Sequence, residues 1–131
     1  MKFPPPVAAL IGLQLIEMAN GESRMELLAE DRHANPMGTI HGGILCDLAD
    51  AAMGTAYFST LEPEESFTTL ELKINFVRPF WTGRLRANGR VVDRGRTVGM
   101  TECDILDERG RLIARATSTC MTLRGEAASG R

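Results

Sequence analysis

One stretch, residues 35–57, limits what this chain can fold into, because it alone has the pattern of a long helix. It opens as a loop, with turn signals at Asn35-Pro36 and Gly38. From Gly42 onward the sequence has no Pro and is rich in Leu, Ala and Met, which favour helix formation. We therefore predict a helix over about Gly42–Tyr57, and the rest of the chain must pack around it.

The predicted helix carries an acidic residue in an apolar setting. Asp50 stands mid-helix, and the residues one turn away include Cys46, Met53 and Gly54. A carboxylate there costs free energy unless it is paired, solvated or used. Asp50 is therefore a candidate functional group. One face of the helix is predicted to be apolar, with Ile44, Leu48, Ala51, Ala52 and Thr55, while Asp47, Asp50, Gly54 and Tyr57 share another.

The start of the predicted helix offers hydrogen-bond donors. The first backbone N–H groups of a helix have no intrahelical partner, and they carry the positive end of the helix dipole. Because Gly42 and Gly43 lack side chains, a ligand oxygen can approach their N–H groups closely. Asn35 adds an amide. A Gly-rich turn into a helix is also a common structural feature, so this pattern alone leaves a purely structural interpretation open.

The run NPMGTIHGGILCDLADAAMG, residues 35–54, resembles the signature of hotdog-fold acyl-CoA thioesterases of the phenylacetate-pathway (PaaI-like) type. That signature is N-x-x-G-T-x-H-G-G followed by a helix whose acidic residue lies eight positions after the first Gly of the pair. Asn35, Gly42 and Asp50 match it without a gap. The runs 68–80 and 93–99 also resemble the family, and the resemblance covers roughly residues 10–123.

The resemblance implies roles for these residues. The Gly42 N–H would hold the thioester oxygen, and the Asn35 side chain would contact the carbonyl or the water. Asp50 would act as general base, or as a nucleophile that forms an anhydride. His41 and Gly43 would belong to the substrate-binding end of the helix. We expect His41 to form hydrogen bonds at the helix start, since no G-x-S-x-G nucleophile accompanies it.

Related thioesterases use a hydroxyl on the long strand to assist the base, and the matching block places it at Thr69. The alternation of that strand gives Thr69 the same side as Glu71 and Lys73, whereas Thr68 shares the apolar side. Either the hydroxyl lies on the unexpected face or a β-bulge resets the register. Both Thr68 and Thr69 therefore remain candidates.

A basic turn, Arg94-Gly95-Arg96-Thr97, joins two predicted strands. As a sequence feature it is most simply a solvated hairpin. In related thioesterases the corresponding region contacts the nucleotide phosphates of coenzyme A, which arginine can bind through a fork of N–H donors. The resemblance therefore assigns these four residues to substrate binding.

The remaining segments predict an α+β fold with one antiparallel sheet. A helix is expected over residues 4–10, and Asn20-Gly21 signals a hairpin. Leu70, Leu72, Ile74 and Phe76 alternate with polar residues and would pack against the central helix. The resemblance names this arrangement the hotdog fold, a single domain with a sheet wrapped around one long helix. The strands are expected at Leu13–Ala19, Ser23–Glu30, Thr68–Phe76, Gly83–Arg94, Arg96–Leu106 and Arg111–Leu123, with a disordered tail from about residue 124.

Composition narrows the range of partners. The net charge is −2 over 131 residues and no Lys/Arg cluster stands out, which argues against nucleic acid and a membrane surface as partners. The three cysteines are expected to be reduced, buried thiols of a cytoplasmic protein. His33 and His41 are the only histidines and no CxxC occurs, so we expect no metal site. The resemblance implies a coenzyme A thioester as substrate and no separate cofactor.

Helix geometry predicts that the active site is shared between chains. Gly42 and Asp50 are eight residues apart, so they lie on the order of 12 Å apart along the axis at about 1.5 Å per residue. Catalytic contacts are about 3 Å long, so one thioester carbon cannot reach both. We therefore expect a homodimer with two shared sites, and a dimer of dimers beyond it.

Two other functions remain open. One is a hotdog module that binds acyl-CoA without catalysis, although binding alone needs no carboxylate near the thioester. The other is a hotdog hydratase or dehydratase, which uses a His with a carboxylate in a different arrangement. The acyl group is also open among arylacetyl, hydroxybenzoyl and medium-chain groups, and the side chains expected to shape its pocket are Met53, Tyr57, Phe58 and Phe67.

Overall fold

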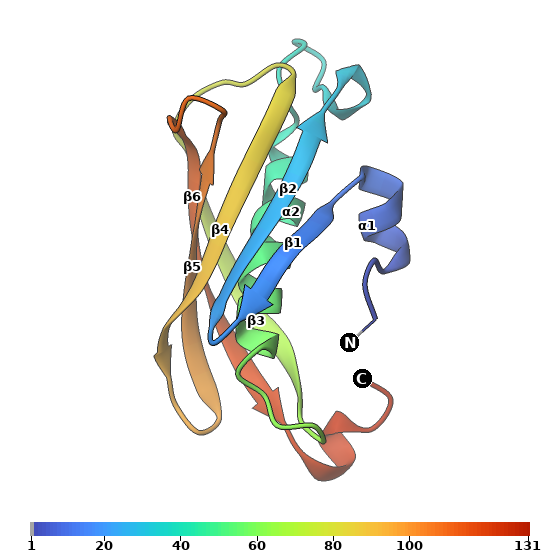
Figure 1. Ribbon diagram of the computed structural model, residues 1–131, viewed down its shortest axis with the longest axis vertical. Helices are drawn as coiled ribbons and strands as arrows, with labels where there is room; N and C mark the ends of the chain where they lie inside the picture. Colours follow the sequence, from blue (N-terminus) through green and yellow to red (C-terminus); the bar gives the residue numbers. More distant parts are fainter. Residues whose placement is uncertain (1) are drawn as a thin grey trace.

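A six-stranded antiparallel sheet curls around one long helix in the computed structural model, which describes residues 2–131 (Figure 1). The strand order is β1-β2-β4-β5-β6-β3, so β1 and β3 are the edges. This confirms the predicted α+β hotdog fold. The elements are α1 (Pro6–Ile11), β1 (Gln14–Ala19), β2 (Glu22–Ala29), the 3-10 helix η1 (Asp31–His33), α2 (Gly42–Phe58), β3 (Ser66–Phe76), β4 (Gly83–Arg94), β5 (Val98–Leu106), β6 (Leu112–Leu123) and the 3-10 helix η2 (Gly125–Ala128).

Local signals account for most of these boundaries. Asn20 and Gly21 both have positive φ, 54° and 82°, as a tight two-residue hairpin requires. Strand β5 starts at Val98 rather than at Arg96, because the Gly95 N–H is bonded to the Val98 carbonyl inside the turn. The tail differs from the expected disorder, since residues 125–128 form η2.

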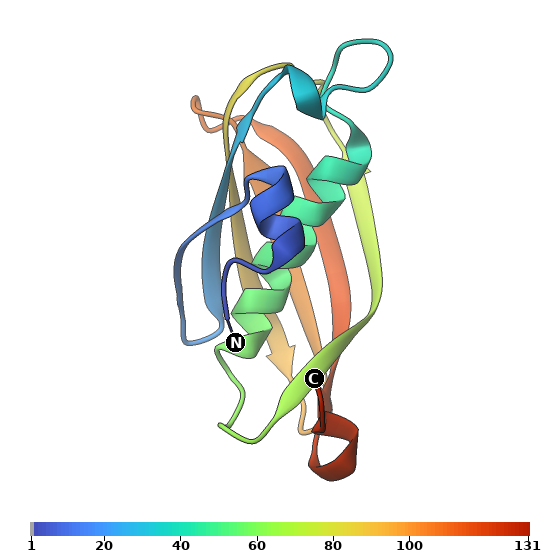
Figure 2. The ribbon, with the colours of Figure 1, turned by 90° about the vertical axis from the view of Figure 1, so that its right-hand side faces the viewer.

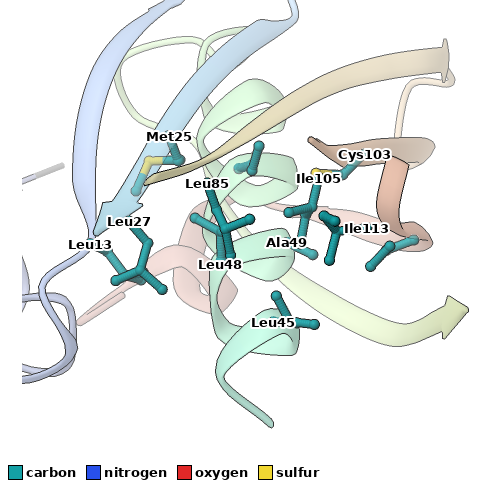
Figure 3. Packing of buried hydrophobic residues seen from close by; sticks show 14 of the residues in the cluster. Leu13, Met25, Leu27, Leu45, Leu48, Ala49, Leu85, Cys103, Ile105 and Ile113 are labelled. Carbon is teal, nitrogen blue, oxygen red and sulfur yellow. The ribbon is translucent and has the colours of Figure 1, made fainter. Parts of the chain in front are cut away.

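Helix α2 packs chiefly against β4 and β2, and a glycine allows the close approach. A Cβ on Gly89 would lie 2.4 Å from the carbonyl oxygen of Ala52, so any side chain there would push the helix away. Around this contact lies the apolar core, part of which Figure 3 shows. It includes Leu13, Met25, Leu27, Leu45, Leu48, Ala49, Leu85, Cys103, Ile105 and Ile113.

The buried face of α2 is rotated from the predicted one. Ile44 and Ala51 are only half-buried, whereas Leu45 and Ala49 are fully enclosed. Tyr57 lies seven residues after Asp50 and so shares a side of α2 with it, as predicted, but it is not a surface residue. Its ring is completely buried, and its hydroxyl forms a 2.7 Å hydrogen bond with the Thr122 hydroxyl. An internal partner for the hydroxyl removes the cost of burying it.

Strand β3 contains a β-bulge at Leu70. Thr69 and Glu71 pair with consecutive residues of β6, so Leu70 between them has no partner. The extra residue resets the alternation, and Thr69 shares the helix-facing side with Leu72 and Ile74. The bulge thus settles the choice of face in favour of Thr69 over Thr68, which pairs on the outer side.

The same bulge corrects the predicted contacts of β3 with the helix. Leu70 does not pack against α2 and is 52% exposed. Leu72 and Ile74 do pack against the core, as predicted. Phe76 is 56% exposed, although its ring also contacts the start of α2 at Gly42. The unpaired edge of β3 therefore carries exposed apolar side chains.

Helix α1 lies across α2 on the side away from the sheet (Figure 2). Two residues from η1 hold its C-terminal end. The Arg32 guanidinium donates to the carbonyls of Leu10 and Ile11 at 2.8 and 3.0 Å. The buried His33 ring accepts from the Glu30 N–H through Nδ1, so its Nε2 carries the proton and donates to the Ile11 carbonyl at 2.8 Å.

Candidate active site

The start of α2 leaves one backbone donor free. His41 caps the helix, because its Nδ1 accepts from the Gly43 N–H at 2.9 Å. The next two N–H groups bond to the His41 carbonyl. Within residues 2–131 the Gly42 N–H has no partner, and it lies at the positive end of a 17-residue helix. Gly42, rather than Gly43, is therefore the available donor, and His41 has the hydrogen-bonding place expected of it.

The loop before α2 holds Asn35 in one orientation. Its Oδ1 accepts from the N–H groups of Met37 and Thr39 at 2.9 and 3.2 Å. One amide hydrogen is donated to the Thr39 hydroxyl at 2.8 Å. An amide has two N–H donors, so the second stays available to a ligand. The Asn35 side chain is thus both a loop support and a fixed donor.

Asp47 and Asp50 both have a raised pKa, and that of Asp50 is raised although its side chain still reaches solvent in the single chain. Loss of solvation raises its pKa, and the charge of Asp47 raises it further, while a hydrogen bond from the Thr69 side chain opposes the shift. A base whose pKa is moved toward neutrality is better matched to proton transfer than an ordinary carboxylate. Asp50 and Thr69 do lie together, which the alternation of the strand allowed only if a β-bulge was present.

Two separate cavities contain these groups. Asn35 and Gly42 line one of about 400 Å³, with the Phe76 ring beside them. Asp50 and Thr69 line another of about 360 Å³. The two cavities share no lining residue. In one chain the donors and the carboxylate therefore belong to different half-sites.

In the basic turn, residues 94–97, one arginine supports the fold and the other is free. The Arg94 guanidinium lies 4.8 Å from the centre of the Tyr57 ring and donates to the Thr60 hydroxyl at 2.9 Å. It also bonds to the carbonyl of Gly95. Arg96 and Thr97 are exposed, and no partner of the Arg96 side chain lies among residues 2–131. Arg94 supports the turn, whereas Arg96 is free to meet a ligand.

The sequence analysis did not identify the N-terminal segment as a wall of the Asp50 cavity. Phe3, Val7 and Ile11 line it from the N-terminal segment, opposite Ala51 and Phe67. Their apolar character along a short helix was the only signal. Two residues predicted to shape the pocket, Met53 and Tyr57, lie in the core instead, whereas Phe67 does line the cavity.

Two further predictions concern the thiols and the membrane. Cys103 and Cys120 are buried free thiols, whereas Cys46 is only half-buried, so the predicted burial holds for two of the three. Over residues 2–131, no helix combines the length and apolar character needed to cross a bilayer.

The surroundings of Asp50 predict opposite pH shifts for two variants. A base must be ionised, so activity should fall on the acid side as Asp50 gains its proton. Asp47→Asn removes a negative neighbour and should move this acid limb of kcat/KM to lower pH. Thr69→Val removes the stabilising hydrogen bond and should move the limb to higher pH. Full pH–rate profiles check this, and shifts in the same direction would contradict it.

Comparisons with known proteins identify the family. A model of the thioesterase superfamily matches residues 37–114. A thioesterase family protein from Silicibacter pomeroyi is 31% identical, with a TM-score of 0.87 over 92% of this chain and 91% of that chain. A variant of the phenylacetic acid degradation protein PaaI from Thermus thermophilus is 27% identical, with a TM-score of 0.83 over 89% of this chain and 98% of that chain. Human acyl-coenzyme A thioesterase 13 is 28% identical over 82% of this chain and 77% of its own length. The chain therefore belongs to the thioesterase superfamily, as a thioester hydrolase with the hotdog fold.

Proposed function

We propose that this protein hydrolyses acyl-coenzyme A thioesters to a free acid and coenzyme A, with Asp50 as general base. The observation that carries the proposal is the Asp50 carboxyl itself, whose pKa is raised beside the Thr69 hydroxyl in a largely apolar cavity. A module that only binds acyl-CoA has no need for such a group. The names of relatives such as acyl-coenzyme A thioesterase 13 support the choice of substrate.

The half-sites supply the groups that the reaction needs. The free Gly42 N–H would donate to the thioester oxygen and stabilise the oxyanion as it develops. The second amide hydrogen of Asn35 would bond to the same carbonyl or to the attacking water. Asp50 would take a proton from the attacking water as the water oxygen bonds to the thioester carbon. The oxyanion then re-forms its C=O bond as the C–S bond breaks, and the sulfur takes up the proton that Asp50 holds, so coenzyme A leaves as the thiol.

These groups can act together only if two chains share a site. One chain keeps its donors and its carboxylate in different cavities, eight residues apart on α2. A two-fold dimer with antiparallel α2 helices would bring Gly42 of one protomer to Asp50 of its partner. The free edge of β3, with Leu70 and Phe76 exposed, supports pairing there, since unpaired apolar edges invite another strand. A dimer of dimers remains a further prediction.

Cys46 provides a proximity test of the shared site. It lies midway between Gly42 and Asp50, on the same side of α2, so the proposed two-fold axis should pass next to it. A short bis-maleimide is expected to link two chains through Cys46, because the other two thiols are buried. The cross-linked dimer should be visible on a denaturing gel and absent in Cys46→Ser. Complete alkylation of Cys46 without a covalent dimer would contradict the arrangement.

Arg96 is the proposed contact for a coenzyme A phosphate. Arg96→Ala should raise KM by roughly ten- to 150-fold and leave kcat nearly unchanged, since a hydrogen bond to a charged group contributes about 1.5–3 kcal/mol to binding. The effect should vanish with an acyl-pantetheine, which has no nucleotide. Arg109→Ala, at an exposed arginine of the β5–β6 hairpin, is the matched control. An equal loss with both substrates would exclude the phosphate contact.

Thiol release from acyl-CoA tests the proposed function directly. A thiol reagent should report free coenzyme A at a rate that depends on enzyme concentration. Saturable acyl-CoA binding without thiol release would instead identify a binding module. Hydration of an enoyl-CoA without thiol release would identify a hydratase.

A further inference from the structure

The cavity beside Asp50 is shaped for the acyl part of a substrate, and the inference drawn from it rests on the proposed thioesterase function. Asp50 and Thr69 lie at its wall, so the reacting carbon would be next to them. The other walls are mainly apolar. Helix α1 contributes Val7 and Ile11, α2 contributes Ala51 and Gly54, and β3 contributes Phe67.

Gly54 is the residue that keeps this space open. It lies one turn after Asp50 inside α2, where glycine is less favourable than any residue except proline. Its backbone has an ordinary helical conformation, and a Cβ would meet only the edge of the Phe67 ring, at 3.4 Å. Neither backbone geometry nor crowding by neighbouring backbone requires glycine there. What the missing side chain leaves is volume in the cavity.

The polar groups of the cavity wall leave nothing to receive a hydroxyl on the acyl group. The Thr55 hydroxyl donates to the Ala51 carbonyl at 2.7 Å and bonds to the Ser23 hydroxyl at 2.6 Å, so its hydrogen is already used, and the residue is only 3% exposed. Asp47, Asp50 and Thr69 belong to the reacting end. Lys2, the one cation of the wall, is exposed to solvent. A polar substituent deep in the cavity would therefore be buried without a partner.

The volume of the cavity within one chain indicates how long an acyl group it can enclose. The cavity holds about 360 Å³. Roughly twelve methylene-sized groups fit, at about 30 Å³ each, the share that a water molecule takes in the liquid. An octanoyl or phenylacetyl group is well within this limit, and a palmitoyl chain exceeds it.

We propose that this thioesterase selects an apolar acyl group of medium length without a polar substituent, and that Gly54 sets the depth of its pocket. Helix α1 forms the outer wall. The bonds from Arg32 and His33 to the last carbonyls of α1 fix that wall to the loop that leads to Asn35 and α2. The wall of the acyl pocket and the donor loop are thus one connected unit.

A panel of acyl-CoAs with pocket variants tests this. For wild type, kcat/KM should rise by up to about fourfold per added methylene from butyryl-CoA to octanoyl-CoA, the value of burying one CH₂. It should fall again for palmitoyl-CoA. Phenylacetyl-CoA should exceed 4-hydroxyphenylacetyl-CoA by roughly five- to 150-fold, the cost of an unpaired buried hydroxyl.

Gly54→Leu should lower the octanoyl-to-butyryl ratio of kcat/KM at least tenfold, and Gly54→Ala should lower it by less. The alanine variant adds only one carbon next to Phe67, so it keeps the test valid if leucine prevents folding. Leu10→Ala is the matched control. Leu10 lies on α1 like Val7 and is 73% exposed, but it does not line the cavity, so this variant should keep both rate and ratio.

The possible failures are distinguishable. Absence of thiol release from every acyl-CoA would refute the proposed function itself. Thiol release with a preference for the hydroxylated aryl group, or for glutaryl-CoA with its terminal carboxylate, would refute the apolar pocket and leave the function standing. An octanoyl-to-butyryl ratio unchanged in folded Gly54→Ala and Gly54→Leu would refute the role of Gly54.

Discussion

Replacement of Asp50 by Asn is expected to lower kcat by about a hundredfold to ten-thousandfold, the range typical of general acid–base groups. The amide has nearly the same shape as the carboxyl but cannot take a proton from water. Substrate binding should change little, so KM should stay close to that of wild type. Steady-state thiol release from the best acyl-CoA of the panel measures both quantities.

Asp47→Asn is the matched control for this loss. It removes the same charge less than one turn away on α2, and above the acid limb it should keep most of the wild-type rate. An Asp50→Asn protein that retains more than about a third of wild-type kcat would exclude Asp50 as the base, since so small a loss lies outside that range.

The same substitution should stabilise the fold slightly, since Asp50 still reaches solvent in the single chain. Lost solvation and the charge of Asp47 raise the pKa of Asp50 in the native state, so its ionised form opposes folding. Stability from this group is present when it is protonated and is lost as the pH rises through its native pKa. Asn resembles the neutral form, so Asp50→Asn should have a higher Tm than wild type at neutral pH. A variant that is both slower and more stable would show that the carboxylate is kept for its chemistry.

Sequence patterns predicted the architecture where local signals agreed with the final packing. The run after Gly42 became α2, and Asn20-Gly21 became a tight hairpin. Strand β3 shows where such reasoning fails. Strict alternation put Leu70 against the helix and Thr69 outside, and one bulge reversed both. A bulge depends on pairing with β6, far along the chain, so no local pattern in residues 68–76 could locate it.

The sequence could nominate the residues of the candidate site, but it could not show their surroundings. Asn35, Gly42 and Asp50 stood out through spacing and resemblance, and the structure adds how each is held. The Gly43 N–H donates to the His41 ring, and this cap geometry cannot be seen in the sequence alone. The acyl pocket wall in α1 is a tertiary contact between the chain start and the middle of α2. The apolar residues of α1 could indicate that this helix is buried, but not which element it packs against.

Mixing two inactive variants should restore activity, and this is the second large effect that the shared site predicts. Asn35→Asp keeps the oxygen that accepts from Met37 and Thr39, so the loop is preserved, but it loses the amide donor. Asp50→Asn loses the base. In a mixed dimer one site collects both lesions, and the other takes its intact Asn35 from one chain and its intact Asp50 from the other.

The decisive measurement is therefore thiol release after the two variants are unfolded together and refolded. With random pairing about half of the dimers are mixed, and half of their sites are intact by symmetry. We expect activity near a quarter of wild type, far above either parent refolded alone. Tags of different size on the two chains would show that mixed dimers have formed. If mixed dimers are present and the mixture stays as inactive as its parents, the site does not combine Asn35 and Gly42 of one chain with Asp50 of the other.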